Sequence, residues 1–504
     1  MKRKFTVFAM LAAAAVSSTV AMGVDVQTLA YSTSDGASGL RLAWRPDTLS
    51  QWIPLNYDFV KSDFGPWGSH KKMFRPKLVL DRNSGRWTAT WEATPEGDVV
   101  AFATTDNFAD WTPQKYFASA LDLPRDIIPA RMPVPVRTRI NGEEVEGWMQ
   151  PMPEETIASI REYVKKRQDL AALYSEQAKD DASRFTGLGP VSVSIHPRPE
   201  DAKAISDKLI GIFFEDINYG ADGGLYAELI QNRDFEYSPS DHGGWGSMTA
   251  WTTSGDGVAT VITVIGTVGP FYEGADYEAG WKLARELDVP IVDEHYYVAP
   301  GWLIYNRDYY DKYPRGGTKV YLGEYASHLP GRPSNVETAL SDALYLTDVE
   351  RNADVVAMTS YAPLLAKKGH TQWNPDLIYF DNTSVTPTVE YYVQKMYGNN
   401  SGQTYVPSDV TVGSDDMKVR ARIGVSIVDD ADSGDRILKL VNMLPVEVNA
   451  DIDTDALGVS PGVYNATLLS GDPADTGARP VKTKISLPSV KLPPYSFTVV
   501  RLRK

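Results

Sequence analysis

The strongest constraint on the fold is an alternation of strand-like and helix-like stretches in the second half of the chain. Apolar runs of strand length are followed by stretches with helical spacing, from about residue 259 to about residue 400. Such alternation indicates βαβ units, in which consecutive strands lie parallel in one sheet. The predicted strands are 259–265, 290–297, 319–325, 354–361 and 377–380, and the predicted helices are 277–287, 335–353 and 388–397.

The regions on either side of this α/β block, which we assign to 259–400, are β-rich. In the region 190–258 the pattern opens with Val191, Val193 and Ile195 alternating with polar residues, which signals a half-buried strand. The region 401–504 returns to short β-runs between Gly, Pro and Asp turns. We expect 401–504 to form a C-terminal β-sandwich to which the strands of 190–258 contribute.

The region 24–152 is strand-like and rich in tryptophan. The stretches LRLAWRPDTLSQWIP (40–54) and VAFATTDNFADWTP (100–113) each contain an apolar strand, an Asp, a Trp and a Pro in the same order. A repeated strand–turn–Trp unit indicates propeller blades, with two unrelated hairpins as the alternative. The following region, 153–189, is predicted to be a connecting helix, because apolar residues recur there at helical spacing.

The first 23 residues predict a signal peptide. A basic start, Lys2-Arg3-Lys4, precedes an apolar stretch at 5–16 and small residues at 19–21. The chain has no cysteine, which excludes disulfides, thiolate metal sites and a lipid-modified cysteine at the cleavage point. We therefore expect an exported bacterial protein, periplasmic or extracellular, that is not a lipoprotein and has no membrane span.

The net charge restricts the partners. With 65 acidic and 50 basic residues the formal charge is −15. A surface this acidic repels phosphate backbones, so nucleic acid is not expected as a partner, whereas neutral ligands such as sugars are compatible with it. The composition leaves homo-oligomerisation open.

Carboxylates follow three of the apolar runs. They occur in GIFFEDI (211–217), VDEHYY (292–297) and VYLGEYA (320–326). Substrates bind at the carboxyl ends of parallel strands, where the βα loops meet. A structural ion pair is the alternative for each Glu alone, but two such strand ends with a His between them favour a functional site.

Aromatic residues are dense around these motifs, and sugars pack their C–H faces against such rings. Other chemistries lack their motifs: there is no phosphate-binding or dinucleotide glycine loop and no H-E-x-x-H pair. No metal or other cofactor is predicted. The alternative is a metal ion bound by Asp293, Glu294 and His295. The aromatic residues concerned are Tyr296, Tyr297, Trp302, Tyr305, Tyr309, Tyr310 and Tyr325.

Together these motifs resemble the α-L-arabinofuranosidases of glycoside hydrolase family 51. The similarity covers roughly residues 190–504 and includes TVGPFYEG (267–274) and YAPLLAKKGHTQWNPDLIYFDN (361–382). The resemblance implies a (β/α)₈ TIM-type barrel with a C-terminal β-sandwich. It also implies hydrolysis of arabinofuranosides with retention, without a cofactor. The front region resembles part of the family 43 propellers.

The resemblance assigns roles residue by residue. Glu324 in GEYA matches the nucleophile, and His295 and Tyr297 match residues that line the sugar subsite. Glu215 in FFEDI matches a carboxylate that holds arabinose hydroxyls, and Gln372 is a candidate for a further sugar contact. A retaining hydrolase needs the nucleophile and a general acid about 5 to 5.5 Å apart.

One part of the family pattern is missing. The family's acid/base Glu lies in a Gly-Asn-Glu motif on an earlier barrel strand, and this chain contains no Gly-Asn-Glu. A complete barrel takes roughly 250 residues and eight strands, whereas the region 259–400 offers four or five strands. The sequence therefore predicts an incomplete barrel without an identified acid/base, and Glu294 or Glu273 is a candidate substitute.

The predicted function is hydrolysis of terminal non-reducing α-L-arabinofuranosyl residues of plant polysaccharides. Arabinan, arabinoxylan and arabinogalactan all remain open as the polysaccharide. One alternative is a non-catalytic carbohydrate-binding relic, which the missing acid/base motif favours. Another is a β-xylosidase or arabinanase-type glycosidase, which would depend on the front region.

Overall fold

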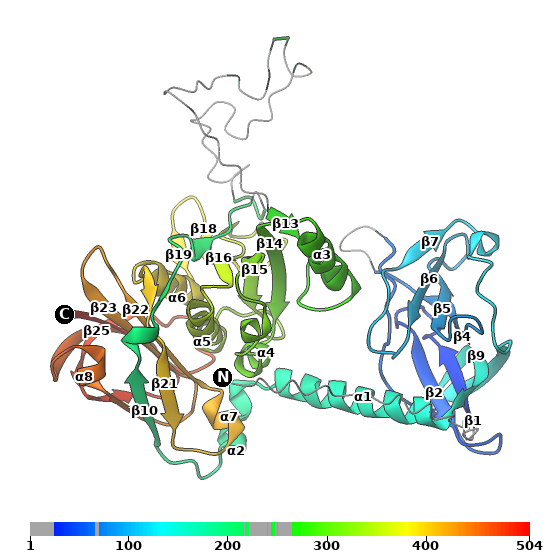
Figure 1. The fold of residues 1–504 in the computed structure, drawn as a ribbon, viewed down its shortest axis with the longest axis horizontal. Coiled ribbons are helices and arrows are strands. Elements are labelled where there is room, and N and C mark those ends of the chain that lie inside the picture. Colours follow the sequence, from blue (N-terminus) through cyan, green and yellow to red (C-terminus); the bar gives the residue numbers. More distant parts are fainter. Residues whose placement is uncertain are drawn as a thin grey trace, which may run out of the picture. The chain divides into compact units, whose positions relative to one another are not determined.

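The computed structural model describes residues 25–65, 70–215, 217–220 and 265–503, together with single positions between 239 and 249. The chain divides into two units, Met1–Gln168 and Asp169–Lys504, and helix α1 (Glu154–Tyr174) runs across their boundary (Figure 1). The predicted signal peptide and almost all of the predicted strand 259–265 lie outside the described residues.

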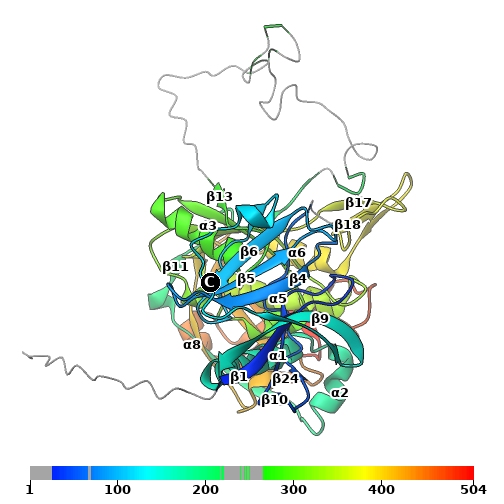
Figure 2. The same ribbon diagram turned by 90° about the vertical axis from the view of Figure 1, so that its right-hand side faces the viewer.

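The first unit contains two antiparallel sheets (Figure 2). Apolar side chains from both sheets form a common core that includes Leu42, Trp87, Trp91 and Phe108. Four strands that follow one another across a sheet are the arrangement of one propeller blade, and the propeller itself stays a prediction. The five-stranded sheet has the order β3 (Ile53–Pro54), β2 (Arg41–Arg45), β1 (Asp25–Tyr31), β9 (Glu143–Pro153), β8 (Val134–Ile140), and the four-stranded sheet runs β4 (Phe74–Leu80), β5 (Trp87–Glu92), β6 (Val100–Thr105), β7 (Lys115–Phe117).

The two repeated stretches differ in what their tryptophans contact. Trp111 packs against the core between the sheets, whereas Trp52 packs on a separate cluster with the guanidinium of Arg45 4.3 Å from its ring centroid. Asp47 accepts backbone hydrogen bonds in the first turn, and Asn107 does so in the second. The repeat therefore preserves a turn type but not the surroundings of the Trp.

The second unit is built around a parallel sheet of five strands. The described residues form no closed barrel, because the edge strands β12 and β13 pair only with β16 and β14. The predicted strand 377–380 is wrong as a member of this sheet: it is β18, in a small separate sheet with β17 (Leu365–Lys367) and β19 (Val385–Pro387). The parallel sheet has the order β12 (Ile210–Ile212), β16 (Val356–Tyr361), β15 (Lys319–Ser327), β14 (Ile291–Val298), β13 (Ile265–Thr267).

The three predicted helices of this unit are confirmed. They are α3 (Ala275–Glu286), α5 (Val336–Arg351) and α6 (Val389–Gly398). Helix α5 begins where Asn335 accepts a hydrogen bond from the backbone N–H of Thr338 at 3.0 Å, which satisfies one of the free donors of the first turn. The sequence did not predict the short helix α4 (Pro300–Tyr305).

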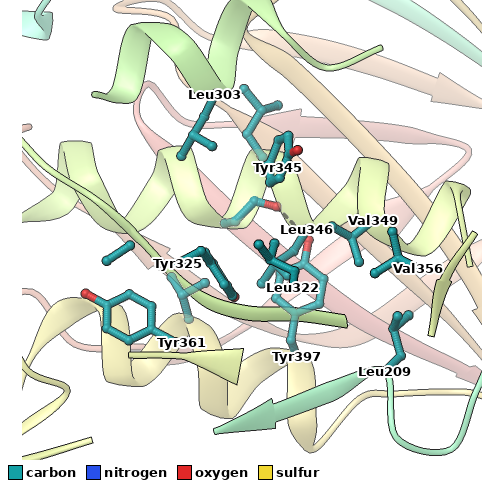
Figure 3. Close-up of a cluster of buried hydrophobic side chains, with 14 of the residues drawn as sticks. Leu209, Leu303, Leu322, Tyr325, Tyr345, Leu346, Val349, Val356, Tyr361 and Tyr397 are labelled. Atoms are coloured by element: carbon teal, nitrogen blue, oxygen red, sulfur yellow. Dashed lines mark hydrogen bonds between the residues drawn. The ribbon is translucent and has the colours of Figure 1, made fainter. Parts of the chain in front are cut away.

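Helix α5 is buried along almost its whole length. Figure 3 shows Leu346 and Val349 of α5 among side chains of the parallel sheet such as Leu322 and Val356. The other side of α5 faces the β-sandwich, where Glu350 forms a fully buried ion pair with Lys439 of β23. The helix therefore joins the sheet and the sandwich in one hydrophobic core.

The β-sandwich encloses a second apolar core. Strand β10 pairs with β24 and β21, which confirms that the region after residue 190 contributes to the sandwich. The short helices α7 (Met417–Arg420) and α8 (Thr454–Leu457) connect its strands, and the short helix α2 (Asp181–Arg184) precedes β10. One sheet runs β11 (Lys203–Ala204), β20 (Thr404–Tyr405), β22 (Ile423–Asp429), β23 (Asp435–Asn442), β28 (Ser496–Arg503), β25 (Gly462–Ser470), β26 (Val481–Leu487), and the other runs β21 (Ser408–Val412), β10 (Val191–Pro197), β24 (Val448–Ile452), β27 (Ser489–Leu492).

Candidate active site

Four of the predicted site residues lie at one edge of the parallel sheet. Glu215 follows β12, His295 and Tyr297 belong to the end of β14, and Glu324 lies near the end of β15. Because these strands are parallel, their carboxyl ends meet at the same edge. The fold therefore gathers side chains that are far apart in the sequence.

A β-bulge at Gly323 determines the side on which Glu324 lies. Val320 and Leu322 point into the apolar core beneath the helices, and strict alternation would place Glu324 on that side too. The pairing of β14 with β15 skips Gly323, so that His295 lies opposite Glu324. The bulge thus moves the carboxylate out of the core and onto the face that carries His295.

One oxygen of Glu324 is held by two neighbours. The Tyr297 hydroxyl donates to Oε2 at 2.9 Å, and His295 Nδ1 lies 3.5 Å from the same oxygen. The other ring nitrogen of His295, Nε2, lies 2.8 Å from Oδ2 of Asp293. The imidazole therefore bridges two carboxylates.

The surroundings of His295 favour its charged form. Burial lowers the pKa of the imidazole, but the hydrogen bond to Asp293 and the negative charges of Asp293, Glu324 and Glu215 together raise it above its usual value. A protonated His295 places a positive charge beside Glu324.

Glu215 responds to the same cluster. Burial and the negative charge of Glu324 raise the pKa of the Glu215 carboxyl, while His295 acts in the opposite direction. The three groups are thus close enough to interact electrostatically. Glu215 holds a proton more readily than an exposed glutamate does and can donate a hydrogen bond.

The predicted contact residue Gln372 is exposed, and its backbone N–H donates to Asn218 Oδ1 at 2.7 Å. Its neighbour Trp373 lies closer to the site, with its ring centroid 5.1 Å from that of Tyr297. The His328 ring stacks on the Tyr297 ring, with the ring centroids 5.0 Å apart and an interplanar angle of 13°. Sequence reasoning missed Trp373 and His328, although a Trp among polar residues in HTQWNPD was an available signal.

Asn218 connects the loop that carries Glu215 to the loop that carries Trp373. Its side chain is buried, accepts from the backbone N–H of Trp373 at 2.9 Å, and donates to the Trp373 carbonyl and to Asp376 Oδ1, both at 2.9 Å. Burial, together with the charge of Glu215, raises the pKa of Asp376 to about 7 despite these hydrogen bonds. Asn218 therefore positions two parts of the site relative to each other.

Glu294 lies on the opposite side of β14 and does not face Glu324. Its side chain is fully buried and accepts hydrogen bonds from Trp281 Nε1 at 3.0 Å and from the Tyr313 hydroxyl at 2.7 Å. The suggestion that Glu294 replaces the missing acid is therefore wrong. Glu273 lies in the loop between β13 and α3, at the carboxyl end of the edge strand.

The described residues contain no group of three or more His, Asp or Glu side chains arranged to hold a metal ion. Within the same residues, no helix combines the length and the apolar character that crossing a bilayer requires.

Residues 309–496 match the family of the α-L-arabinofuranosidase C-terminal domain. An extracellular exo-α-L-arabinofuranosidase of Streptomyces chartreusis is 42% identical over 195 residues, which cover 34% of this chain and 23% of that protein. α-L-Arabinofuranosidase 2 of Arabidopsis thaliana is 34% identical over 128 residues, which cover 25% of this chain and 19% of that protein. The chain thus spans about a fifth of the length of these relatives.

Among solved structures, the family 51 arabinofuranosidase of Xanthomonas axonopodis pv. citri aligns with a TM-score of 0.39 and 16% identity, over 51% of this chain and 61% of that one. The family match and the curated relatives confirm the predicted resemblance to α-L-arabinofuranosidases. The resemblance of the front region to family 43 stays a prediction.

Proposed function

We propose that this protein hydrolyses terminal non-reducing α-L-arabinofuranosyl residues of plant polysaccharides, with retention of configuration and with Glu324 as nucleophile. The observation that carries the proposal is the position of Glu324. The bulge turns its carboxylate to the edge of the sheet where substrates bind, and His295 and Tyr297 hold it there. The names of the relatives supply the sugar.

In the proposed reaction Glu324 attacks the anomeric carbon, the glycosidic C–O bond breaks and the leaving group departs with its oxygen. The resulting covalent glycosyl-enzyme is then hydrolysed by water, which releases arabinose and frees Glu324. Both of its contacts, Tyr297 and His295, engage Oε2. We therefore expect Oε1 to form the bond to the sugar. The Tyr297 hydroxyl fixes the orientation of the carboxylate, and His295 lies beside the same oxygen.

The remaining site residues suit recognition of a furanose. Glu215 can exchange hydrogen bonds with sugar hydroxyls. Trp373 and His328 form, with Tyr297, an aromatic surface against which the C–H face of the ring can pack. Gln372 stays a proposed contact, which its exposed side chain would make only with a longer substrate.

No residue of this chain is assigned the role of the general acid that protonates the leaving group. Loss of a general acid costs about 10² to 10⁴ in rate, and the cost is smallest for leaving groups that depart as stable anions. We therefore propose that aryl arabinofuranosides are hydrolysed much faster than polysaccharide side chains. Binding of arabinosyl residues without hydrolysis is the second candidate function, which the missing acid favours.

The decisive experiment measures hydrolysis of a 4-nitrophenyl α-L-arabinofuranoside by the full chain, by Glu324→Gln and by Glu286→Gln. Glu286 lies on helix α3, where it forms only an exposed ion pair with Lys282, so its variant controls for the loss of one carboxylate. Turnover abolished in Glu324→Gln and retained in Glu286→Gln supports the proposal. A folded protein without turnover would refute it and would leave sugar binding as the function to test.

We further propose that the protein is exported, and that residues 24–152 form a propeller-like accessory region. The basic and apolar start of the sequence supports export, and one relative is named as extracellular. A β-xylosidase or arabinanase activity would have to come from this accessory region. Assaying the Glu324→Gln variant on aryl xylosides and on arabinan separates that activity from the site described above.

A further inference from the structure

A groove of about 960 Å³ lies in the second unit. Its lining residues lie between Tyr392 and Arg503, later in the sequence than the carboxylates of the candidate active site. Helix α6 contributes Tyr392 and Lys395 to it, and the neighbouring strands contribute Thr467 and Lys482. Thr467 and Lys482 face each other across β25 and β26, while the adjacent Ala466 points into the sandwich core. The groove therefore lies on the outer face of the seven-stranded sheet, beside α6.

The groove is basic although the whole chain is strongly acidic. Four exposed cations line it, and within the described residues none of them lies within 4 Å of a carboxylate oxygen. A fifth, Arg501, is paired with Asp430 and Asp435. The four are Lys395, Arg479, Lys482 and Arg503.

Local contacts orient two of these cations. The Arg479 guanidinium lies 4.9 Å from the ring centroid of Tyr392 and donates to the carbonyl of Ala478 at 2.9 Å. Lys482 Nζ donates to Thr467 Oγ1 at 3.0 Å. These contacts use only part of the donor capacity of each group, so N–H donors remain for an anionic ligand.

The other lining groups suit a sugar chain. Asn465 and Thr467 offer side-chain hydrogen-bonding groups from β25, and Tyr392 offers an aromatic ring. Hydroxyl-rich ligands need such donors and acceptors, and the volume is at the upper end for sites that hold small molecules. An oligosaccharide of a few residues therefore fits the groove better than a single sugar does.

We propose that this groove binds a uronic-acid-containing polysaccharide, with the sugar carboxylates on Arg479, Lys482, Lys395 and Arg503. Guanidinium groups pair with carboxylates through two parallel hydrogen bonds, and the lysines add positive charge along the chain. The choice of a polysaccharide as the anion rests on the proposed function. The site would hold acidic plant polysaccharide while the Glu324 site acts on neutral arabinosyl residues.

Affinity electrophoresis of the full chain in native gels tests the groove. Wild type is compared in gels that contain polygalacturonate, neutral arabinan, duplex DNA or no polymer. We expect retardation by polygalacturonate that weakens as salt rises, because exposed charge pairs are screened. Retardation by DNA that equals that by polygalacturonate at the same charge concentration would overturn the proposal in favour of non-specific anion binding.

The variant that tests the assignment is the triple Lys395→Gln, Lys482→Gln, Arg503→Gln. Its matched control neutralises three exposed lysines elsewhere in the same unit, Lys208, Lys282 and Lys491, each already paired at the surface. We expect the groove triple to bind polygalacturonate at least about tenfold more weakly, and the control triple to bind like wild type. Equal weakening in both triples would refute a specific site.

The measurement is repeated with Glu324→Gln. Retained binding by this variant separates the groove from the catalytic carboxylate, so a chain without arabinofuranosidase activity can still confirm the groove. If the full chain shows no retardation by polygalacturonate at low salt, the proposal is wrong whatever the activity of the Glu324 site.

Discussion

The bulge at Gly323 gives a prediction that links backbone geometry to the chemistry of the site. A methyl group built at this position would lie 2.0 Å from Asp293 Oδ1, 2.9 Å from Asp293 Cγ and 3.1 Å from the Tyr321 ring. Asp293 cannot move away freely, because its Oδ2 lies 2.8 Å from His295 Nε2. Gly323→Ala must therefore break the Asp293–His295 contact or displace strand β15.

Either response has a cost that can be measured. Inserting a methyl group into a close-packed site costs about 1–3 kcal/mol of the free energy of unfolding. Loss of the Asp293 contact removes a hydrogen bond that raises the pKa of His295, so that pKa falls. With less positive charge beside Glu324 and a displaced carboxylate, we expect kcat/KM on the aryl arabinofuranoside to fall about tenfold to a hundredfold.

Three measurements check this prediction: urea unfolding, NMR titration of the histidine ring protons, and the aryl arabinofuranoside assay. Gly317→Ala is the matched control, because a methyl group there meets no heavy atom within 4 Å. An unchanged pKa of His295 in Gly323→Ala would refute the reasoning even if the protein were inactive. A loss of stability as large in Gly317→Ala would refute it as well.

Three further predictions concern a buried carboxyl, a buried ion pair and one hydroxyl. Burial raises the pKa of Glu390 to about 7, above its unfolded value, so its stabilising contribution is fully present below about pH 4.5 and is lost as pH rises through 7. Between pH 4.5 and 7.5 the free energy of unfolding, measured with urea, should change by roughly 3 kcal/mol less in Glu390→Gln than in wild type. Lys439→Met leaves the buried Glu350 carboxylate without its partner and should cost about 3–5 kcal/mol, much of which the double variant with Glu350→Gln should restore in the same assay. Tyr297→Phe removes the hydroxyl that donates to Glu324 and should lower kcat/KM about tenfold or more, and unchanged kinetics would contradict the role given to Tyr297.

The sequence predicted the elements whose signals are local. The start of α5 could be read from Asn335 before an apolar run, because an N-cap residue needs no distant partner. The alternation of Val191, Val193 and Ile195 likewise predicted β10, whose odd positions are all buried. Alternation along β14 also shows that Glu294 and His295 lie on opposite faces. That reading would have excluded Glu294 as the acid from the sequence alone.

What the sequence could not predict depends on pairing between segments. Nothing local in VYLGEYA states that Gly323 is skipped in the pairing, and a regular strand would have placed Glu324 in the core. The position of Trp373 beside Tyr297 depends on Asn218, which joins two loops far apart in the chain. Such contacts follow from the packing of the whole unit, which single-residue patterns do not encode.

The direct contacts of the Glu324 carboxylate come from the neighbouring strand. His295, Tyr297 and Asp293 all belong to β14, and the bulge that orients Glu324 belongs to β15. The edge strand β12 leads to Glu215, whose charge also acts on His295. The edges of the sheet further decide whether a strand opposite can supply a proton. Comparing a leaving group that needs protonation with one that does not therefore distinguishes two cases. In the first, Glu324 alone is active; in the second, the chain also has a general acid.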